Sequence, residues 1–289
     1  MRPFDPRVTP ARADLAAKEL YGKVAALRYA EGSAYEIIAP QTPVRGEPRP
    51  DAPLATEALR GERVTVYDIN AEGWAWGQLS ADGCVGWLAE SALKPSGRRS
   101  THKVAALRTL VFPGPSIKLP PLEALPFGAQ LVVAETKDQM AITPARGYVP
   151  AAHLAPVKQY ERDFIAVAER FVGAPYLWGG KTVLGLDCSG LVQVALAACG
   201  IASPRDSDMQ EEVLGHPIAA EAVLANPQRG DLLFWKGHVA MVRDRTSLIH
   251  ANAFHMAVAI EPIAEAVSRI RAGGIEISSI RRLPRTNAS

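Results

Sequence analysis

The sequence predicts a multidomain protein in which two small all-β barrels precede an α+β domain. Residues 30–155 are rich in proline, glycine and short β-branched runs, with little helical periodicity. A weak internal repeat lies within this stretch. From about residue 160, helical and strand-like patterns follow one another, which indicates a separate domain. A chain of 289 residues is long enough for two or three domains.

The first 30 residues are expected to form a helical segment, with one helix over 13–26 packed on the rest of the chain. The opening MRPFDPRVTPARADLAAKEL has two early arginines but lacks the apolar core of a secretory signal peptide. On this pattern alone, the expected location is the cytoplasm.

The repeat predicts two β units of about 60 residues. Each unit begins with a strand-like run, continues with a second such run, and ends in a segment whose sequence resembles the end of the other unit. The matching segments are ALRGERVTV (58–66) with ALPFGAQLVV (124–133), and GWLAESAL (86–93) with GYVPAAHL (147–154). Short strands with turn signals favour small barrels, which we expect over 31–97 and 101–156.

The α+β domain is expected over 158–285. An apolar stripe over 161–171 predicts an amphipathic helix. A second helix, described below, is followed by strand-like runs at 231–235, 238–243, 247–251 and 257–261. Such a meander would put the second helix against a sheet.

A glycine-rich loop leads into this second helix, in the string GAPYLWGGKTVLGLDCSGLVQVAL at 173–196. The helical spacing of Leu191, Val194 and Ala198 puts Cys188 near the helix N-terminus. The N–H groups and the dipole of the first turn stabilise an anion there. We therefore expect a lowered thiol pKa and a nucleophilic role for Cys188.

Two downstream histidines could serve this thiol. His238 opens a strand 50 residues after Cys188 and would act as general base, then protonate the leaving amine. His250 lies 12 residues further, on the expected next strand, and would orient the His238 ring. The alternative for each is a non-catalytic role as a hydrogen-bonded histidine of the core. The histidines expected to be surface or structural residues are His153, His216 and His255.

Composition excludes several function classes. Net charge is +2, from 32 basic and 30 acidic residues, and no block of like charge favours nucleic acid. No apolar run reaches the roughly 18 residues of a membrane span. The three cysteines are odd in number and lack metal-ligand spacing, which is typical of a reducing compartment and predicts no metal and no cofactor. Cys84 and Cys199 are expected in the core.

The motifs DCSG, GDLLFW followed by HVAM, and LIHA together resemble the NlpC-type family of bacterial cell-wall cysteine peptidases, which have a papain-like fold. The tandem barrels, SH3-like in that family, resemble the branch of γ-D-glutamyl–L-diamino-acid endopeptidases. This resemblance covers residues 30–285. It implies hydrolysis of the γ-D-Glu–L-diamino acid bond in murein peptides with a free N-terminal L-Ala, in peptidoglycan recycling. The diamino acid could be meso-diaminopimelate or lysine.

The resemblance also assigns binding residues. Tyr176, with the Cys188 backbone N–H, would stabilise the oxyanion. Asp206 and a first-barrel glutamate, for which Glu62 is the best candidate, would bind the L-Ala ammonium. The remaining expected substrate contacts are Asp187, Ser189, Arg205, Ser207 and Trp178. The alternative for residues 205–208 is a solvated charged turn.

One position departs from the family pattern. Related enzymes often have an aromatic residue before the last strand of the first barrel, where ADGCVGW places Cys84. Either Trp74, Trp76 or Trp87 supplies the aromatic wall, or the pocket is more open.

Two other functions remain open on sequence grounds. The barrels could attach an exported hydrolase or a silent scaffold to peptidoglycan, or the third domain could be a papain-like acyltransferase. The missing signal pattern argues against export, and the intact Cys188, His238 and His250 argue against a silent domain. The expected partners are murein peptides, with no nucleic acid and no membrane; the sequence does not predict an oligomeric state.

Overall fold

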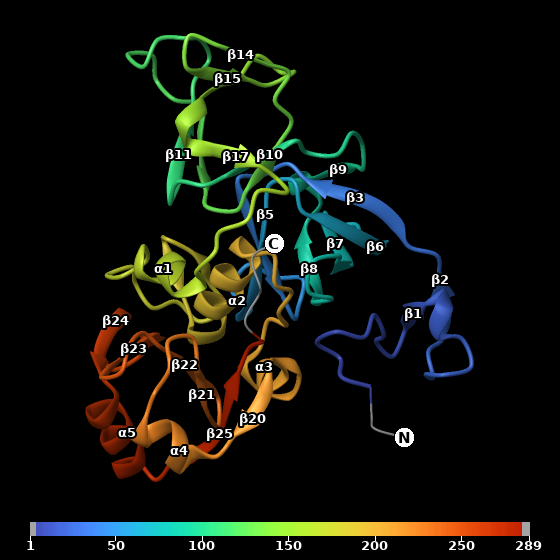
Figure 1. The fold of residues 1–289 in the computed structure, drawn as a ribbon. Helices are drawn as coiled ribbons and strands as arrows, with labels where there is room; N and C mark the ends of the chain where they lie inside the picture. The colour runs from blue at the N-terminus through green and yellow to red at the C-terminus, as the bar shows by residue number, and fades with distance from the viewer. Residues whose placement is uncertain (1–3, 285–289) are drawn as a thin grey trace. The chain divides into compact units, whose positions relative to one another are not determined.

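The computed structural model describes residues 4–284, except for the side chains of 221–223. The chain forms two compact units, Met1–Gln159 and Tyr160–Ser289 (Figure 1). Among the described residues, no helix is long and apolar enough to cross a membrane.

The N-terminal segment is not the helix expected over 13–26. It contains β1 (Leu15–Ala17), a 3-10 turn (Lys18–Leu20) and β2 (Arg28–Ala30), and the two strands pair in parallel. All three residues of β1 are buried, and Leu15 packs on Trp76 and Trp87. An amphipathic helix would turn part of this run toward solvent. Burial against the indoles therefore overrides the local helical pattern.

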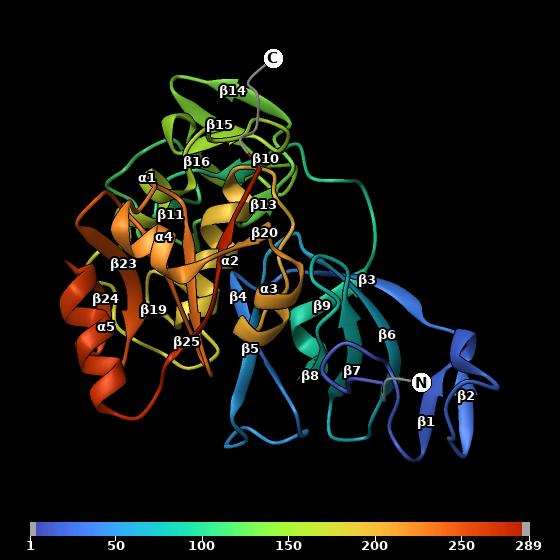
Figure 2. The ribbon, with the colours of Figure 1, turned by 60° about the horizontal axis from the view of Figure 1, so that its bottom comes forward.

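One seven-stranded antiparallel sheet follows, in the order β5-β4-β8-β7-β6-β3-β9 (Figure 2). Its core includes Ile37, Leu79, Leu88 and the buried Cys84. The strands are β3 (Ser33–Ile37), β4 (Gln41–Arg45), β5 (Leu54–Leu59), β6 (Arg63–Ile69), β7 (Trp74–Leu79), β8 (Val85–Ala89) and β9 (Leu93–Pro95), with a 3-10 turn at Glu90–Ala92 before β9.

Residues 102–156 form three smaller sheets, in the orders β13-β10-β17, β11-β12 and β14-β15-β16. Val104, Leu125 and Val149 belong to their shared core. A second barrel over 101–156 stays a prediction. The strands are β10 (His102–Val104), β11 (Arg108–Val111), β12 (Glu123–Pro126), β13 (Gln130–Leu131), β14 (Glu135–Lys137), β15 (Met140–Ile142), β16 (Tyr148–Pro150) and β17 (Leu154–Pro156), with a 3-10 turn at Ala151–His153.

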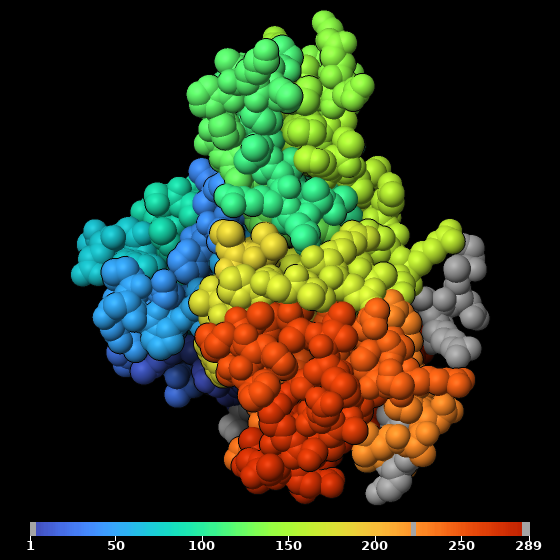
Figure 3. Space-filling view, turned by 90° about the vertical axis from the view of Figure 1, so that its left-hand side faces the viewer, coloured from blue at the N-terminus to red at the C-terminus, as the bar shows by residue number. Residues whose placement is uncertain are grey.

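The C-terminal unit is built on a six-stranded sheet of order β20-β25-β21-β22-β23-β24. Helix α2 packs on β22 and β23, as the sequence predicts, and α5 packs beside β24. The helices are α1 (Phe164–Glu169), α2 (Cys188–Ala198), α3 (Ser207–Val213), α4 (Ala220–Ala225) and α5 (Ile263–Ala272). The strands are β18 (Lys181–Thr182), β19 (Gly185–Leu186), β20 (His216–Ile218), β21 (Leu232–Trp235), β22 (His238–Val242), β23 (Ser247–Asn252), β24 (Ala257–Pro262) and β25 (Ile277–Arg282). Figure 3 turns the orange and red surface of this unit toward the viewer.

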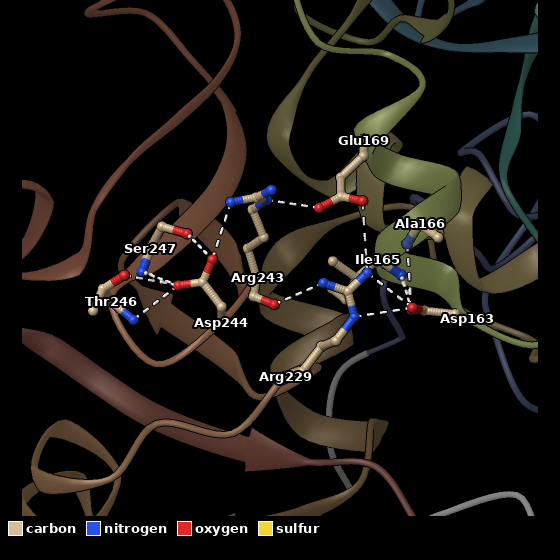
Figure 4. A network of polar contacts seen from close by, with 9 residues as sticks. All are labelled: Asp163, Ile165, Ala166, Glu169, Arg229, Arg243, Asp244, Thr246 and Ser247. Carbon is tan, nitrogen blue, oxygen red and sulfur yellow. Dashed lines mark hydrogen bonds and ion pairs between the residues drawn. The ribbon is translucent and has the colours of Figure 1, made fainter.

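A polar network fastens α1 to the sheet (Figure 4). The Asp163 carboxylate caps α1 by accepting the Ile165 N–H at 2.9 Å, and it also accepts from Arg229 Nε at 2.9 Å. Arg243, just after β22, donates to Glu169 at the other end of α1 at 2.7 Å. Both ends of this short helix are therefore tied to loops that flank the central strands.

The Arg12 guanidinium lies between two indoles of the first sheet. Its carbon is 4.7 Å from the ring centroids of Trp76 and Trp87, and it pairs with Asp14 and Asp68. This contact holds the N-terminal segment on the sheet. Which residue supplies the expected aromatic wall stays a prediction.

We expect Arg12→Met to lower the free energy of unfolding by about 1–3 kcal/mol, because two cation–π contacts and a partly buried ion pair are lost. The measurement is the denaturant midpoint of the full chain. Arg49→Met is the matched control: Arg49 also pairs with two carboxylates, Glu47 and Asp51, but stays solvated. Equal midpoints for the two variants would contradict a role for the indole pair.

Candidate active site

Cys188 is the first residue of α2, at the position that the sequence predicts. The preceding residue, Asp187, is the N-cap, and its carboxylate accepts the Gly190 N–H at 2.7 Å. A Cβ on Gly190 would lie 2.3 Å from the Gly180 carbonyl oxygen, so this position of DCSG requires glycine. The Cys188 residue is only 6% exposed.

The two predicted histidines hydrogen-bond each other. His238 opens β22, and its Nε2 lies 2.8 Å from Nδ1 of His250 on the neighbouring antiparallel strand β23. The backbone N–H of Val239 interacts with the Cys188 sulfur. The two histidines therefore form one cluster, and the Cys188 sulfur lies near the backbone at the start of β22.

Two residues that the sequence reasoning missed extend this cluster. His250 Nε2 lies 2.7 Å from Oε1 of Glu261 on β24, and Arg269 of α5 donates to the same oxygen. Glu261 is 8% exposed and His250 1%. The available signal was a single glutamate in the otherwise apolar strand run AVAIEP. A buried carboxylate needs such partners.

Burial sets the protonation of the resting site. It raises the pKa of the Cys188 thiol to about 11, and the Asp187 charge adds to this rise. Burial and the charges of His250 and Arg269 lower the pKa of His238 to about 3. The expected lowering of the thiol pKa is therefore wrong, because desolvation outweighs the backbone hydrogen bonds from Val239 and Ser189. At neutral pH the thiol and the imidazole are both uncharged.

The outer members of the cluster differ in charge. Burial lowers the pKa of His250 to about 4, although the hydrogen bond to Glu261 opposes this shift. For Glu261, burial alone would raise the pKa, but hydrogen bonds from Arg269 and His250 leave it below its ordinary value. His250 is therefore neutral and Glu261 ionised near pH 7.

Tyr176 lies close to the nucleophile. Burial and the nearby Cys188 and Asp187 charges raise the pKa of its hydroxyl to about 12, so the hydroxyl keeps its proton. Its backbone N–H donates to Met256 just before β24 at 2.9 Å. A protonated phenol is a hydrogen-bond donor of the kind that an oxyanion needs.

The expected substrate residues Asp187, Ser189 and Arg205 form a buried cluster. The Arg205 guanidinium donates to both Asp187 oxygens, at 2.9 and 2.7 Å, and to Ser189 Oγ at 3.0 Å. The Gly179 N–H donates to Asp187 at 2.7 Å. These bonds join the glycine-rich loop, α2 and the segment before α3. Contact of this cluster with a substrate stays a prediction.

The other expected binding residues are Asp206, Ser207, Trp178 and Glu62. Asp206 is at the N-cap position of α3 but makes no side-chain capping hydrogen bond, Ser207 begins the helix, and both are partly buried. Trp178 is 67% exposed. Glu62, in the N-terminal unit, accepts the Leu59 N–H at 3.0 Å across the turn between β5 and β6. The substrate roles of these residues stay predictions.

The histidines His153, His216 and His255 have the surface or structural positions that we expected. His216 and His255 are exposed, and His153 hydrogen-bonds Thr109 at 2.8 Å. Among the described residues, His250, His255 and Glu261 have possible ligand atoms within 4.8 Å of one another, a grouping that sequence spacing did not indicate. Arg269 already neutralises Glu261, which opposes a cation there, and we assign no metal.

We expect Arg205→Met to destabilise the chain by about 3–5 kcal/mol, because it leaves the buried Asp187 carboxylate without its countercharge. Thermal unfolding monitored by circular dichroism measures the effect. Arg170→Met serves as control, because it removes an exposed pair with Glu161 in the same unit. If the two variants have the same melting temperature, the buried pair of Arg205 and Asp187 does not stabilise the unit.

Comparison with known proteins agrees with this geometry. Residues 173–273 match the model of the NlpC/P60 family, and residues 44–93 match that of the bacterial dipeptidyl-peptidase Sh3 domain. A gamma-D-glutamyl-L-lysine dipeptidyl-peptidase from Bacillus cereus is 34% identical over 246 residues, which cover 73% of this chain and 71% of that protein. Dipeptidyl-peptidase 6 from Lysinibacillus sphaericus is 37% identical over 102 residues, 35% of this chain and 36% of the relative.

A crystal structure of an NlpC/P60 family protein from Bacillus cereus has the same fold, with a TM-score of 0.72 and 23% identity over 87% of this chain and all of that one. The predicted order, an SH3-type domain before a papain-like domain, is confirmed. The chain belongs to the NlpC/P60 family and is a cysteine peptidase.

Proposed function

We propose that this peptidase hydrolyses the γ-D-Glu–L-diamino acid bond of murein peptides that carry a free N-terminal L-Ala. One observation carries the chemistry: Cys188 begins a helix with its sulfur near the backbone N–H of Val239, and the preceding residue, His238, is hydrogen-bonded to a second histidine at 2.8 Å. The substrate class rests on relatives from Bacillus cereus and Bacillus subtilis, both named gamma-D-glutamyl-L-lysine dipeptidyl-peptidase.

Acylation begins from the neutral pair. His238 takes the Cys188 proton as the sulfur attacks the amide carbonyl, so charge develops only when substrate is present. The oxyanion is held by the Tyr176 hydroxyl and the Cys188 backbone N–H. The tetrahedral intermediate then collapses as the protonated His238 donates to the leaving amine of the diamino acid.

Deacylation reverses these proton movements. A water molecule occupies the place of the departed amine and gives a proton to His238 as it attacks the thioester carbonyl. Collapse releases the dipeptide with a free γ-carboxylate, and Cys188 recovers its proton. Each step uses the same base and the same oxyanion donors.

Substrate selection is assigned to carboxylates. Asp206, and Glu62 in the N-terminal unit, would pair with the ammonium of L-Ala, which rewards a free N-terminus and penalises a blocked one. Peptides released from the wall have such a terminus, so the proposal includes recycling of these peptides in the cytoplasm. The proposal covers both candidate L-diamino acids at the third position of the substrate, lysine and meso-diaminopimelate.

The Cys188 thiol should react slowly with iodoacetamide at pH 7 and faster with each step in pH toward 11, because a raised pKa leaves little thiolate at neutrality. Peptide mapping by mass spectrometry at a series of pH values separates Cys188 from Cys84 and Cys199. A Cys188 rate that is already at its plateau below pH 7 would show a resting thiolate–imidazolium pair instead.

The free-amine preference tests the function itself. We expect acetylation of the L-Ala amine in L-Ala-γ-D-Glu-L-Lys to reduce kcat/KM by roughly 30- to several-thousand-fold, since losing a desolvated charged contact costs about 2–5 kcal/mol. Asp206→Asn should reduce the ratio of kcat/KM between the free and the acetylated peptide, mostly by slowing hydrolysis of the free peptide. Cys188→Ala should abolish turnover.

The same assay also measures hydrolysis of two further substrates, intact sacculi and the tripeptide that has meso-diaminopimelate in place of lysine. Equal kcat/KM for free and acetylated peptides, or faster release from sacculi, would favour a general wall hydrolase. Transfer of the dipeptide to an added amine in preference to water would favour the acyltransferase.

A further inference from the structure

Four side chains from three strands and a helix are joined in a row that ends away from the nucleophile. His238 Nε2 contacts His250 Nδ1 at 2.8 Å, and His250 Nε2 contacts Glu261 Oε1 at 2.7 Å. Arg269 of α5 completes the row by donating to Glu261. The reaction described above uses the first two members and gives no task to Glu261, although it is a buried charged group.

The row fixes the position of each proton. An ionised carboxylate can only accept hydrogen bonds, so the proton between Glu261 and His250 lies on His250 Nε2. Because His250 is neutral, its Nδ1 then has no proton and must accept. The donor in the next bond is therefore Nε2–H of His238. One carboxylate thus determines the tautomer of two rings in succession.

This arrangement leaves one nitrogen of His238 for the thiol. Nε2 carries a proton and is bonded to His250, whereas Nδ1 has a lone pair. Nδ1 is also the ring nitrogen nearer the backbone, and the adjacent Val239 N–H interacts with the Cys188 sulfur. Nδ1 is therefore the ring nitrogen that remains to accept the Cys188 proton.

We propose that Glu261 is a positioning residue that acts through His250 to select the His238 tautomer whose Nδ1 accepts the Cys188 proton. Arg269 holds the Glu261 carboxylate in place. During attack, the S–H proton moves to Nδ1 and the sulfur electron pair forms the bond to the carbonyl carbon. The imidazolium that results keeps its Nε2–H bond to His250. This inference rests on the proposed roles of Cys188 and His238.

A purely structural role for Glu261 is the competing explanation, because the residue also joins β24 to α5. Arg269 supports that view as well, since its guanidinium lies 4.2 Å from the Phe254 ring in the loop before β24. The two explanations differ in what they say about tautomers. If Glu261 acted only as a clamp, meaning a residue that joins β24 to α5, it would stabilise the fold whichever nitrogen of His238 carries the proton.

The first experiment needs neither substrate nor a Glu261 variant. ¹⁵N-histidine-labelled full-length protein at pH 7 shows by NMR which ring nitrogen carries the proton, and His238→Gln and His250→Gln assign the two signals. We expect the Nε2–H tautomer for both rings. An Nδ1–H tautomer at His238 would overturn the proposal. Because this result does not depend on turnover, it can fail or succeed apart from the choice of substrate.

The second experiment compares Glu261→Gln with Glu265→Gln, an exposed residue of α5 that undergoes the same change in charge. A glutamine can face His250 with its oxygen or its nitrogen, so the tautomers should become mixed at His250 and His238. We expect kcat on the free tripeptide to fall roughly ten- to a hundredfold with KM within about twofold, and the control to match the parent.

The readouts separate the two explanations. A lower melting temperature with unchanged tautomers and unchanged kcat would leave Glu261 as a clamp and overturn the proposal. If Glu261→Gln does not fold, the parent protein still tests the proposal: Nε2–H on both rings supports it, and Nδ1–H at His238 overturns it. If the tautomers are as expected and the tripeptide is not cleaved, the proposed substrate is wrong and the positioning role stands.

Discussion

The buried pair between Arg205 and Asp187 is the interaction on which the rest of the site depends. The Asp187 carboxylate caps α2 and accepts the Gly179 N–H of the glycine-rich loop, while Arg205 reaches it from the segment before α3. Three segments that are distant in the sequence therefore meet at one carboxylate. Cys188 follows Asp187 directly, so the position of the sulfur is defined by this pair. Two charges held this far from water also shape the potential that the thiol experiences.

The sheet supplies the other half of the site by register. In antiparallel β23 and β24, His250 faces Ala259, which puts Glu261 two residues further on the same face. The beginning of β24 also pairs with the loop of Tyr176, since Val258 exchanges backbone bonds with Gly173 and Ala174. Strand β24 thus carries Glu261, which accepts the hydrogen bond of His250, and it also holds the backbone near Tyr176, the proposed oxyanion donor. A shift of β24 by one residue would disturb both.

Much of this could be predicted from the sequence, for identifiable reasons. Cys188 at a helix start and His238 at a strand start are visible because glycine, aspartate and apolar periodicity mark element boundaries locally. The N-terminal helix was wrong because Leu15 is buried by indoles more than 60 residues away, and local periodicity contains no such partner. Glu261 was missed because a charged residue in an apolar strand is intelligible only when His250 and Arg269 are seen beside it. The thiol pKa was misjudged because burial is a tertiary property, whereas helix position is a local one.

The low exposure of Cys188 has a consequence for chemical damage. Peroxide and similar oxidants attack the thiolate, and their rate follows thiolate content and access. A cysteine that is 6% exposed as a residue, and whose thiol has a raised pKa, offers oxidants little of either. Cysteine peptidases that keep a permanent thiolate gain a ready nucleophile but expose it to conversion into sulfenic and sulfinic acids. In this site, burial of the residue and the raised pKa of the thiol both oppose oxidation of Cys188 while no substrate is bound.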